Sequence, residues 1–96
     1  MTSNTKMTRA EKDYFKASLA AIARENFSVE FKFNPDFGLT YFIVVPFKGA
    51  NVKYVSTSVA SPDEKKFRKS VGKSHALNRF RWGGSVAVPA LMEVNG

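Results

Sequence analysis

The stretch "FSVEFKFNPDFGLTYFIVV" (residues 27–45) decides the fold, because it holds two strand patterns separated by a turn. In "FSVEFKF" (27–33), apolar and polar side chains alternate, which is typical of a strand with one buried face. "NPDFG" (34–38) is rich in turn-forming residues. "LTYFIVV" (39–45) is apolar on both faces, as expected of a central strand that is covered on part of its second side. We therefore predict an antiparallel strand pair.

The next segment continues this sheet. Pro46 ends the second strand, since proline cannot donate to a sheet ladder. "FKGAN" (47–51) turns the chain, and "VKYVSTSV" (52–59) has the composition of a third strand. Connections this short join neighbouring antiparallel strands. The sequence therefore predicts a three-stranded antiparallel meander.

A helix is predicted before the sheet, at residues 9–25. Thr8 and Glu11 have the spacing of a capping box, in which each side chain bonds the other residue's backbone amide. Phe15, Leu19 and Ile22 follow at helical spacing and form one apolar face. This face is expected to pack on the sheet.

A second helix is predicted to begin at "SPDE" (61–64), with serine as N-cap, proline in the first turn and glutamate closing another capping box. Phe67 and Val71 lie one turn apart and are expected to face the sheet. Gly72 either weakens this helix or lets its backbone approach a strand closely. The helical pattern ends before the glycine pair at 83–84.

The predicted fold class is α+β: a three-stranded antiparallel sheet with two helices on one face, in the order αβββα. Residues 1–7 are read as a disordered leader, 8–82 as one domain and 83–96 as a tail. Within the tail, "SVAVPALMEV" (85–94) either adds a short edge strand or packs across the core. The expected core consists of Phe15, Leu19, Ile22, Phe31, Tyr41, Ile43, Phe67 and Val71.

Composition narrows the class of protein. A hydrophobic content of 44% across 96 residues is typical of one folded domain. The chain has no cysteine, which excludes disulfides and thiolate metal sites. No cofactor motif is found. With no membrane-length apolar run and no signal-peptide pattern, we expect a cytoplasmic protein with no membrane partner.

Positive charge is concentrated in one segment. The formal net charge is +7, from fifteen basic and eight acidic residues. Residues 65–81 hold seven of the basic residues and no acidic one, so the rest of the chain has eight of each. A solvated surface normally mixes the two signs, whereas a local excess of one sign attracts a polyanion. The segment therefore predicts binding to nucleic acid.

The candidate nucleic-acid-binding residues follow from this segment and its surroundings. The second helix contributes the main phosphate contacts, and the first helix adds two lysines to them. Trp82 lies in the aromatic-basic run "NRFRWGG" (78–84) and either packs in the core or at its edge, or stacks on unpaired bases. Phe80 is expected to continue the core stripe. The basic candidates are Lys65, Lys66, Arg68, Lys69, Lys73, Arg79, Arg81, Lys12 and Lys16.

The segment "EKKFRKSVGKSHAL" (64–77) resembles the second helix of the double-stranded-RNA-binding domain, a family with the same αβββα order. Phe67, Val71 and Gly72 match its small apolar positions, and Lys65 and Arg68 match basic ones. The family's Gly-Pro-x-His loop is missing, since "NPDFG" (34–38) is shorter and lacks histidine. The resemblance implies binding to structured RNA through backbone contacts, without the family's full footprint.

We therefore predict a non-enzymatic protein that binds nucleic acid, RNA in preference to DNA, as an accessory or inhibitor of the kind that phages encode. An exposed sheet edge would permit a homodimer. Two alternatives remain: the basic patch docks on an acidic partner protein, or the chain is a small ribonuclease that uses His75. "GKS" (72–74) does not fit a phosphate-binding loop, because Phe67 stands where that motif needs glycine.

Overall fold

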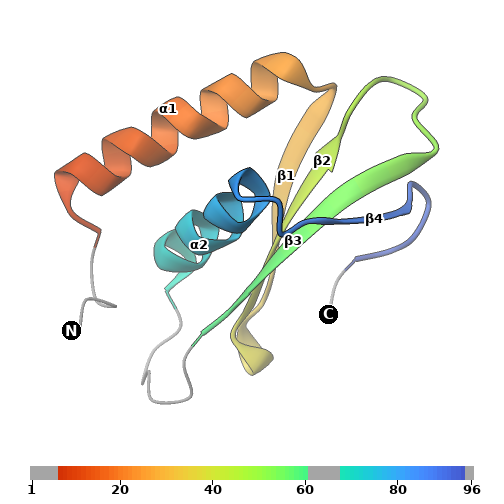
Figure 1. Cartoon of the computed structure of the whole chain (residues 1–96). Helices are drawn as coiled ribbons and strands as arrows, with labels where there is room; N and C mark the ends of the chain where they lie inside the picture. The colour runs from red at the N-terminus through yellow and green to blue at the C-terminus, as the bar shows by residue number, and fades with distance from the viewer. Residues whose placement is uncertain (1–6, 61–67, 95–96) are drawn as a thin grey trace.

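A computed structural model describes residues 7–60 and 68–94 (Figure 1). These residues form two α-helices, a short 3₁₀ helix and one four-stranded antiparallel sheet. The sheet order is β1-β2-β3-β4. This confirms the predicted α+β class and the αβββα order, which a fourth strand extends. The elements are α1 (Arg9–Glu25), β1 (Ser28–Asn34), η1 (Pro35–Phe37), β2 (Leu39–Val45), β3 (Val52–Val59), α2 (Lys69–Arg81) and β4 (Val86–Pro89).

The first two strands form the predicted hairpin. Ser28 pairs with Val45 at one end and Asn34 with Leu39 at the other. The "NPDFG" turn forms η1 and ends at Gly38, whose φ of 65° lies in the left-handed region that glycine adopts without strain. The turn composition therefore fixed the position of the hairpin correctly.

Helix α1 begins as its sequence predicts. The Glu11 amide donates to Thr8 Oγ1 at 3.1 Å, and the Thr8 amide donates to Glu11 Oε1 at 2.7 Å. Both halves of the capping box are therefore present, and they satisfy two amides that a helix end would otherwise leave unpaired. The inward face of α1 carries Ser18 and Ile22, which are buried.

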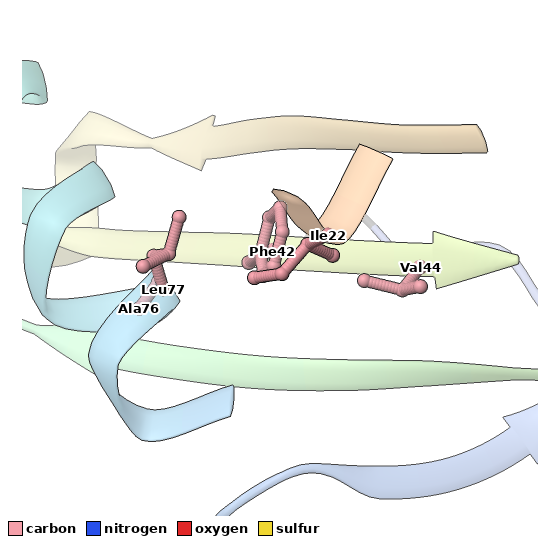
Figure 2. Close-up of a cluster of buried hydrophobic side chains, with 5 residues drawn as sticks. All are labelled: Ile22, Phe42, Val44, Ala76 and Leu77. Carbon is pink, nitrogen blue, oxygen red and sulfur yellow. The ribbon is translucent and has the colours of Figure 1, made fainter. Parts of the chain in front are cut away.

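The core lies between the two helices and the sheet face that carries Phe42 and Val44. Figure 2 shows these two β2 side chains together with Ile22 of α1 and the Ala76–Leu77 pair of α2. Phe42 is fully buried; its ring stacks on Phe31 of β1 at 4.7 Å between centroids. Phe80 meets the same ring edge-on at 5.4 Å, which confirms its predicted place in the core.

The prediction that Tyr41 and Ile43 face the helices is wrong. Side chains alternate along a strand, so Phe42 and Val44 on the helix face put Tyr41 and Ile43 on the opposite face. Ile43 is nevertheless buried, with only 2% of its surface exposed. Because β2 is apolar at both sets of positions, its pattern does not indicate which set faces the helices.

Of the two alternatives that the sequence left open for the C-terminal segment, the edge strand is confirmed. Strand β4 pairs with β3, from Val52 opposite Pro89 to Val55 opposite Val86. The chain then turns back (Figure 1), and Lys53 Nζ donates to the Met92 carbonyl. Strands β2, β3 and β4 and the tail enclose a shallow hollow on the face of the sheet opposite the helices. This hollow is lined by Tyr41, Val55, Val86, Val88, Met92, Glu93 and Val94.

Helix α2 starts later than predicted. Its first residue is Lys69, and Arg68 before it has extended dihedrals, φ −118° and ψ 114°. The predicted cap at residues 61–64 and the predicted core residue Phe67 lie outside the described residues. Val71 is half-buried beside β3 instead of joining the core, because Gly72, Ala76 and Leu77 are the residues that α2 turns toward the sheet.

Gly72 lets α2 approach β2 closely, which confirms the second of its two predicted roles. A Cβ atom at this position would lie 2.2 Å from Oγ1 of Thr40 and 3.1 Å from its Cβ. Thr40 is fully buried, and its hydroxyl has no hydrogen-bond partner within the described part of the chain. The missing side chain therefore sets the depth at which α2 lies on the sheet.

We expect Gly72→Ala to destabilise the fold by about 1–3 kcal/mol, the usual cost of overpacking. At a solvent-exposed helix position the same change stabilises by roughly 1 kcal/mol. A loss of stability would therefore show that Gly72 lies in close contact with Thr40. Urea unfolding of the wild type and the variant measures it. The Thr40→Ala background removes the clashing hydroxyl and should recover part of the loss, because the two positions share one contact. A stabilised Gly72→Ala variant would contradict this packing.

Candidate nucleic-acid interface

The position of α2 is fixed by two contacts with the sheet. Gly72 lies against Thr40 of β2, and Ser56 Oγ of β3 donates to the Ala76 carbonyl at 2.7 Å. This second contact is buried and ties the middle of the helix to the third strand. With the helix axis held in this way, four basic side chains lie on two separate flanks: Lys69 and Lys73 on one, and Arg68 and Arg79 on the other.

The first flank faces β1 and carries two lysines. Lys69 Nζ lies 4.9 Å from the centroid of the Phe33 ring, and Lys73 Nζ lies 5.7 Å from that of Phe31. Ammonium groups at these distances are attracted to the negative faces of the rings. The aromatic residues of β1 therefore hold both lysines beside the sheet, and Lys69 remains exposed.

The second flank faces the end of β3 and forms a cleft of about 470 Å³. We call this hollow the α2–β3 cleft. It brings together two guanidinium groups, one imidazole, one amide, one hydroxyl and one indole, and no carboxylate among the described residues. Its residues are Gly38, Ser58, Val59, Ala60, Arg68, Val71, Gly72, His75, Asn78, Arg79 and Trp82.

The helical residues of the α2–β3 cleft form one stripe. Val71, His75, Asn78 and Trp82 follow at spacings of three or four, which places them on one side of the helix. Arg68 extends the stripe before the first turn. The cleft therefore runs along the helix, with Arg68 at one end and Trp82 at the other.

The cations of this segment carry uncompensated charge in the described part of the chain. None of Arg68, Lys69, Lys73, Arg79 and Arg81 forms an ion pair there. Carboxylates close enough to neutralise these groups would weaken their attraction for an external anion. Within residues 7–60 and 68–94, no ion pair therefore neutralises these five cations.

Arg81 has a different environment from its basic neighbours. Its Nη1 donates to Ser18 Oγ at 2.7 Å and also to the Tyr14 hydroxyl, and its guanidinium lies 5.1 Å from the Tyr14 ring centroid. Both partners belong to α1. Arg81 therefore joins the two helices, and we assign it to packing instead of to the proposed phosphate contacts.

Replacing Arg81 with alanine is expected to lower the free energy of unfolding by about 1 kcal/mol or more, because two side-chain hydrogen bonds between the helices are lost. Arg79→Ala is the matched control: it removes the same charge two residues away, from an exposed side chain. Chemical denaturation of both variants measures the difference. Equal stability of the two would contradict the joining role of Arg81.

Two of the remaining basic candidates, Lys12 and Lys16, are not brought to this surface. Lys12 and Lys16 are exposed on α1. Each is two positions along the chain from Tyr14, which puts it about 200° around the helix from that residue, and Lys16 is equally far from Ser18. Tyr14 and Ser18 face α2, so the lysines lie on the other flank of α1. Lys65 and Lys66 lie outside the described residues.

Trp82 does not pack in the core. It caps the C-terminus of α2, where its backbone amide donates to the Asn78 carbonyl at 3.0 Å, and 84% of its surface is exposed. An indole this exposed gains little from folding, because most of its apolar area stays in water. Of the two alternatives that the sequence left open, the packing one is wrong, and Trp82 lies instead at the end of the α2–β3 cleft.

Sequence reasoning missed Ser58 and Asn78 as members of a site. Neither residue type stands out in a helix or a strand, and their proximity depends on how α2 crosses β3. The sequence predicted no binding role for His75, which shares the cleft with two arginines. The one available signal was the spacing of Val71, His75, Asn78 and Trp82 along one side of the helix.

Across residues 7–60 and 68–94, no three histidine or acidic side chains come together in a group that could hold a metal ion. Within the same ranges, neither helix has the length and apolarity needed to cross a membrane.

The chain matches no known protein-family model, no curated protein and no solved structure.

Proposed function

We propose that this chain is a non-enzymatic nucleic-acid-binding protein that contacts phosphates through α2. The observation that carries the proposal is a set of four cations on two flanks of one helix that form no ion pair with any other residue of the described ranges 7–60 and 68–94. Lys69 and Lys73 lie on the β1 flank, and Arg68 and Arg79 line the cleft on the other. Phosphate groups are the commonest targets of such side chains in nucleic-acid complexes.

Structured RNA is the proposed ligand, in preference to DNA. This part rests on the resemblance of the basic segment and of the αβββα order to the double-stranded-RNA-binding domain, whose members recognise shape and backbone. In the cell, such a protein would act as an accessory or inhibitor, of the phage-encoded kind. Strands β1 and β4 are the two edges of the sheet, so a homodimer through strand pairing at one of them belongs to the same proposal.

Binding assays with three ligands test the proposal. The purified chain is titrated, by gel shift or fluorescence anisotropy, into duplex RNA, duplex DNA and single strands of one sequence. We expect RNA to bind, with an affinity that falls steeply as salt rises, because each neutralised phosphate releases counterion. We also expect RNA to copurify with the protein. Failure of all three ligands to bind at low salt would overturn the proposal and favour an acidic protein partner.

A cleavage assay separates binding from ribonuclease activity. His75 is exposed and shares the cleft with Arg68 and Arg79, but no carboxylate of the described residues lines the cleft to orient it. We therefore expect bound RNA to stay intact over long incubation. Cleavage by the wild type that is lost in His75→Ala would show that the chain is an enzyme.

A further inference from the structure

We infer that the α2–β3 cleft binds a short unpaired stretch of the nucleic acid, with one base stacked on Trp82 and phosphates held by Arg79 and Arg68. This inference rests on the proposed function and names the feature of the ligand that the cleft recognises. It predicts that RNA with an unpaired end or bulge binds more tightly than a fully paired duplex.

The shape of the site favours an unpaired strand. The α2–β3 cleft is a hollow of about 470 Å³ between a helix and the end of a strand. This volume lies in the range of sites that enclose small ligands, roughly 300–1,000 Å³. A duplex is convex and keeps its bases inside the stack, so it cannot place a base in such a hollow. Bases in loops, bulges and ends are unstacked and can enter.

The chemistry at the C-terminal end of the cleft suits a nucleobase. Trp82 offers an indole face to solvent, and Arg79 lies one turn before it on the same side of α2. Aromatic side chains are platforms on which unpaired bases stack, and the nearby Arg79 guanidinium holds a phosphate of the same strand. Asn78 contributes an amide beside them, which has both donors and an acceptor for a base edge.

The rest of the cleft suits the backbone of the same strand. Arg68 precedes the helix and Arg79 lies in its last turn, about 16 Å away along the axis at a rise of about 1.5 Å per residue. His75 lies between them, and Ser58 adds a hydroxyl from β3. Cationic and hydrogen-bonding groups spaced along a hollow follow a strand, whereas a single small anion would need them at one point.

The fluorescence of Trp82 can be used to follow binding at this site. Trp82 is the single tryptophan of the chain, so tryptophan emission reports on the cleft alone. The titrants are a short single-stranded RNA, a blunt RNA duplex, and the same duplex with a single-stranded overhang. We expect quenching by the single strand and by the overhang duplex, and little quenching by the blunt duplex at equal occupancy.

Variants connect the fluorescence to affinity. Trp82→Ala is expected to weaken binding of the overhang duplex about tenfold, the order of one lost base stack, and to leave binding of the blunt duplex unchanged. Trp82→Phe keeps an aromatic face and should retain most of the preference. Phe47→Ala is the matched control, since it removes another exposed aromatic ring from the β2–β3 connection. It should leave both affinities unchanged.

The outcomes separate this inference from the proposed function. If duplex and overhang RNA bind equally, with unchanged emission and no effect of Trp82→Ala, the protein binds nucleic acid but the cleft does not take an unpaired base. If no RNA binds at all, the proposed function itself fails. Equal quenching by an acidic peptide would also overturn the inference, because the site would then recognise negative charge without a base.

Discussion

Replacing Arg68, Lys69, Lys73 and Arg79 with glutamine is expected to reduce the affinity for nucleic acid about a thousandfold near 0.1 M salt. Each phosphate contact on duplex nucleic acid contributes to the binding constant a factor equal to the salt concentration raised to a power of about −0.9. The loss of four contacts removes four such factors, which multiply to about a thousandfold or somewhat more near 0.1 M salt. The slope of the logarithm of the binding constant against the logarithm of the salt concentration should become shallower by about 3–4 in the same variant. Fluorescence anisotropy at several salt concentrations measures both quantities.

The matched control for this variant has the same net charge. It replaces four cations that lie outside α2 and that the proposal leaves out: Arg9, Arg24, Lys32 and Lys48. Both variants lower the formal charge from +7 to +3. If only the total charge mattered, both would lose affinity equally, and the assignment to α2 would be wrong. Circular dichroism checks that each variant remains folded.

Phe42→Ala is expected to lower the free energy of unfolding by about 3–5 kcal/mol. Phe42 is fully buried on the central strand, and its ring contacts Phe31 at 4.7 Å and Phe80 at 5.4 Å. Truncation leaves a cavity where both helices meet the sheet (Figure 2). Since small domains are stable by only about 5–15 kcal/mol, this change should leave much of the protein unfolded at moderate temperature.

The comparison for Phe42 is again Phe47, which is 63% exposed. Phe47→Ala should change stability by less than about 0.5 kcal/mol, as most surface substitutions do. Thermal unfolding followed by circular dichroism measures both variants. A Phe42→Ala protein that melts like the wild type would show that the aromatic contacts of β2 do not hold the core together.

Elements with a strong local pattern could be predicted from the sequence. The capping box at Thr8 sets the start of α1, and the turn residues before Gly38 set the first hairpin. In both places the structure depends on interactions within a few residues of one another. Such interactions are present in the sequence itself, so α1, β1, β2 and β3 lie within one residue of where the pattern put them.

Features that depend on how elements meet could not be predicted. Both faces of β2 are apolar, so its pattern could not show which face meets the helices, and the prediction put Tyr41 and Ile43 on the wrong one. The seating of α2 on the sheet likewise explains why Lys69 and Lys73 lie on a different flank from Arg68 and Arg79. Arg81 was grouped with its basic neighbours, because nothing local shows that Tyr14 and Ser18 of α1 lie beside it.

The most direct test of the central claim is an amide NMR titration of the labelled protein with duplex RNA that carries an unpaired overhang. The account predicts that the largest shift changes fall on residues 68–82, with smaller ones at Ser58 and Ala60 across the cleft. Amides of β4 and of the α1 flank that carries Lys12 and Lys16 should change little. Changes concentrated on those elements, with α2 unaffected, would contradict the account.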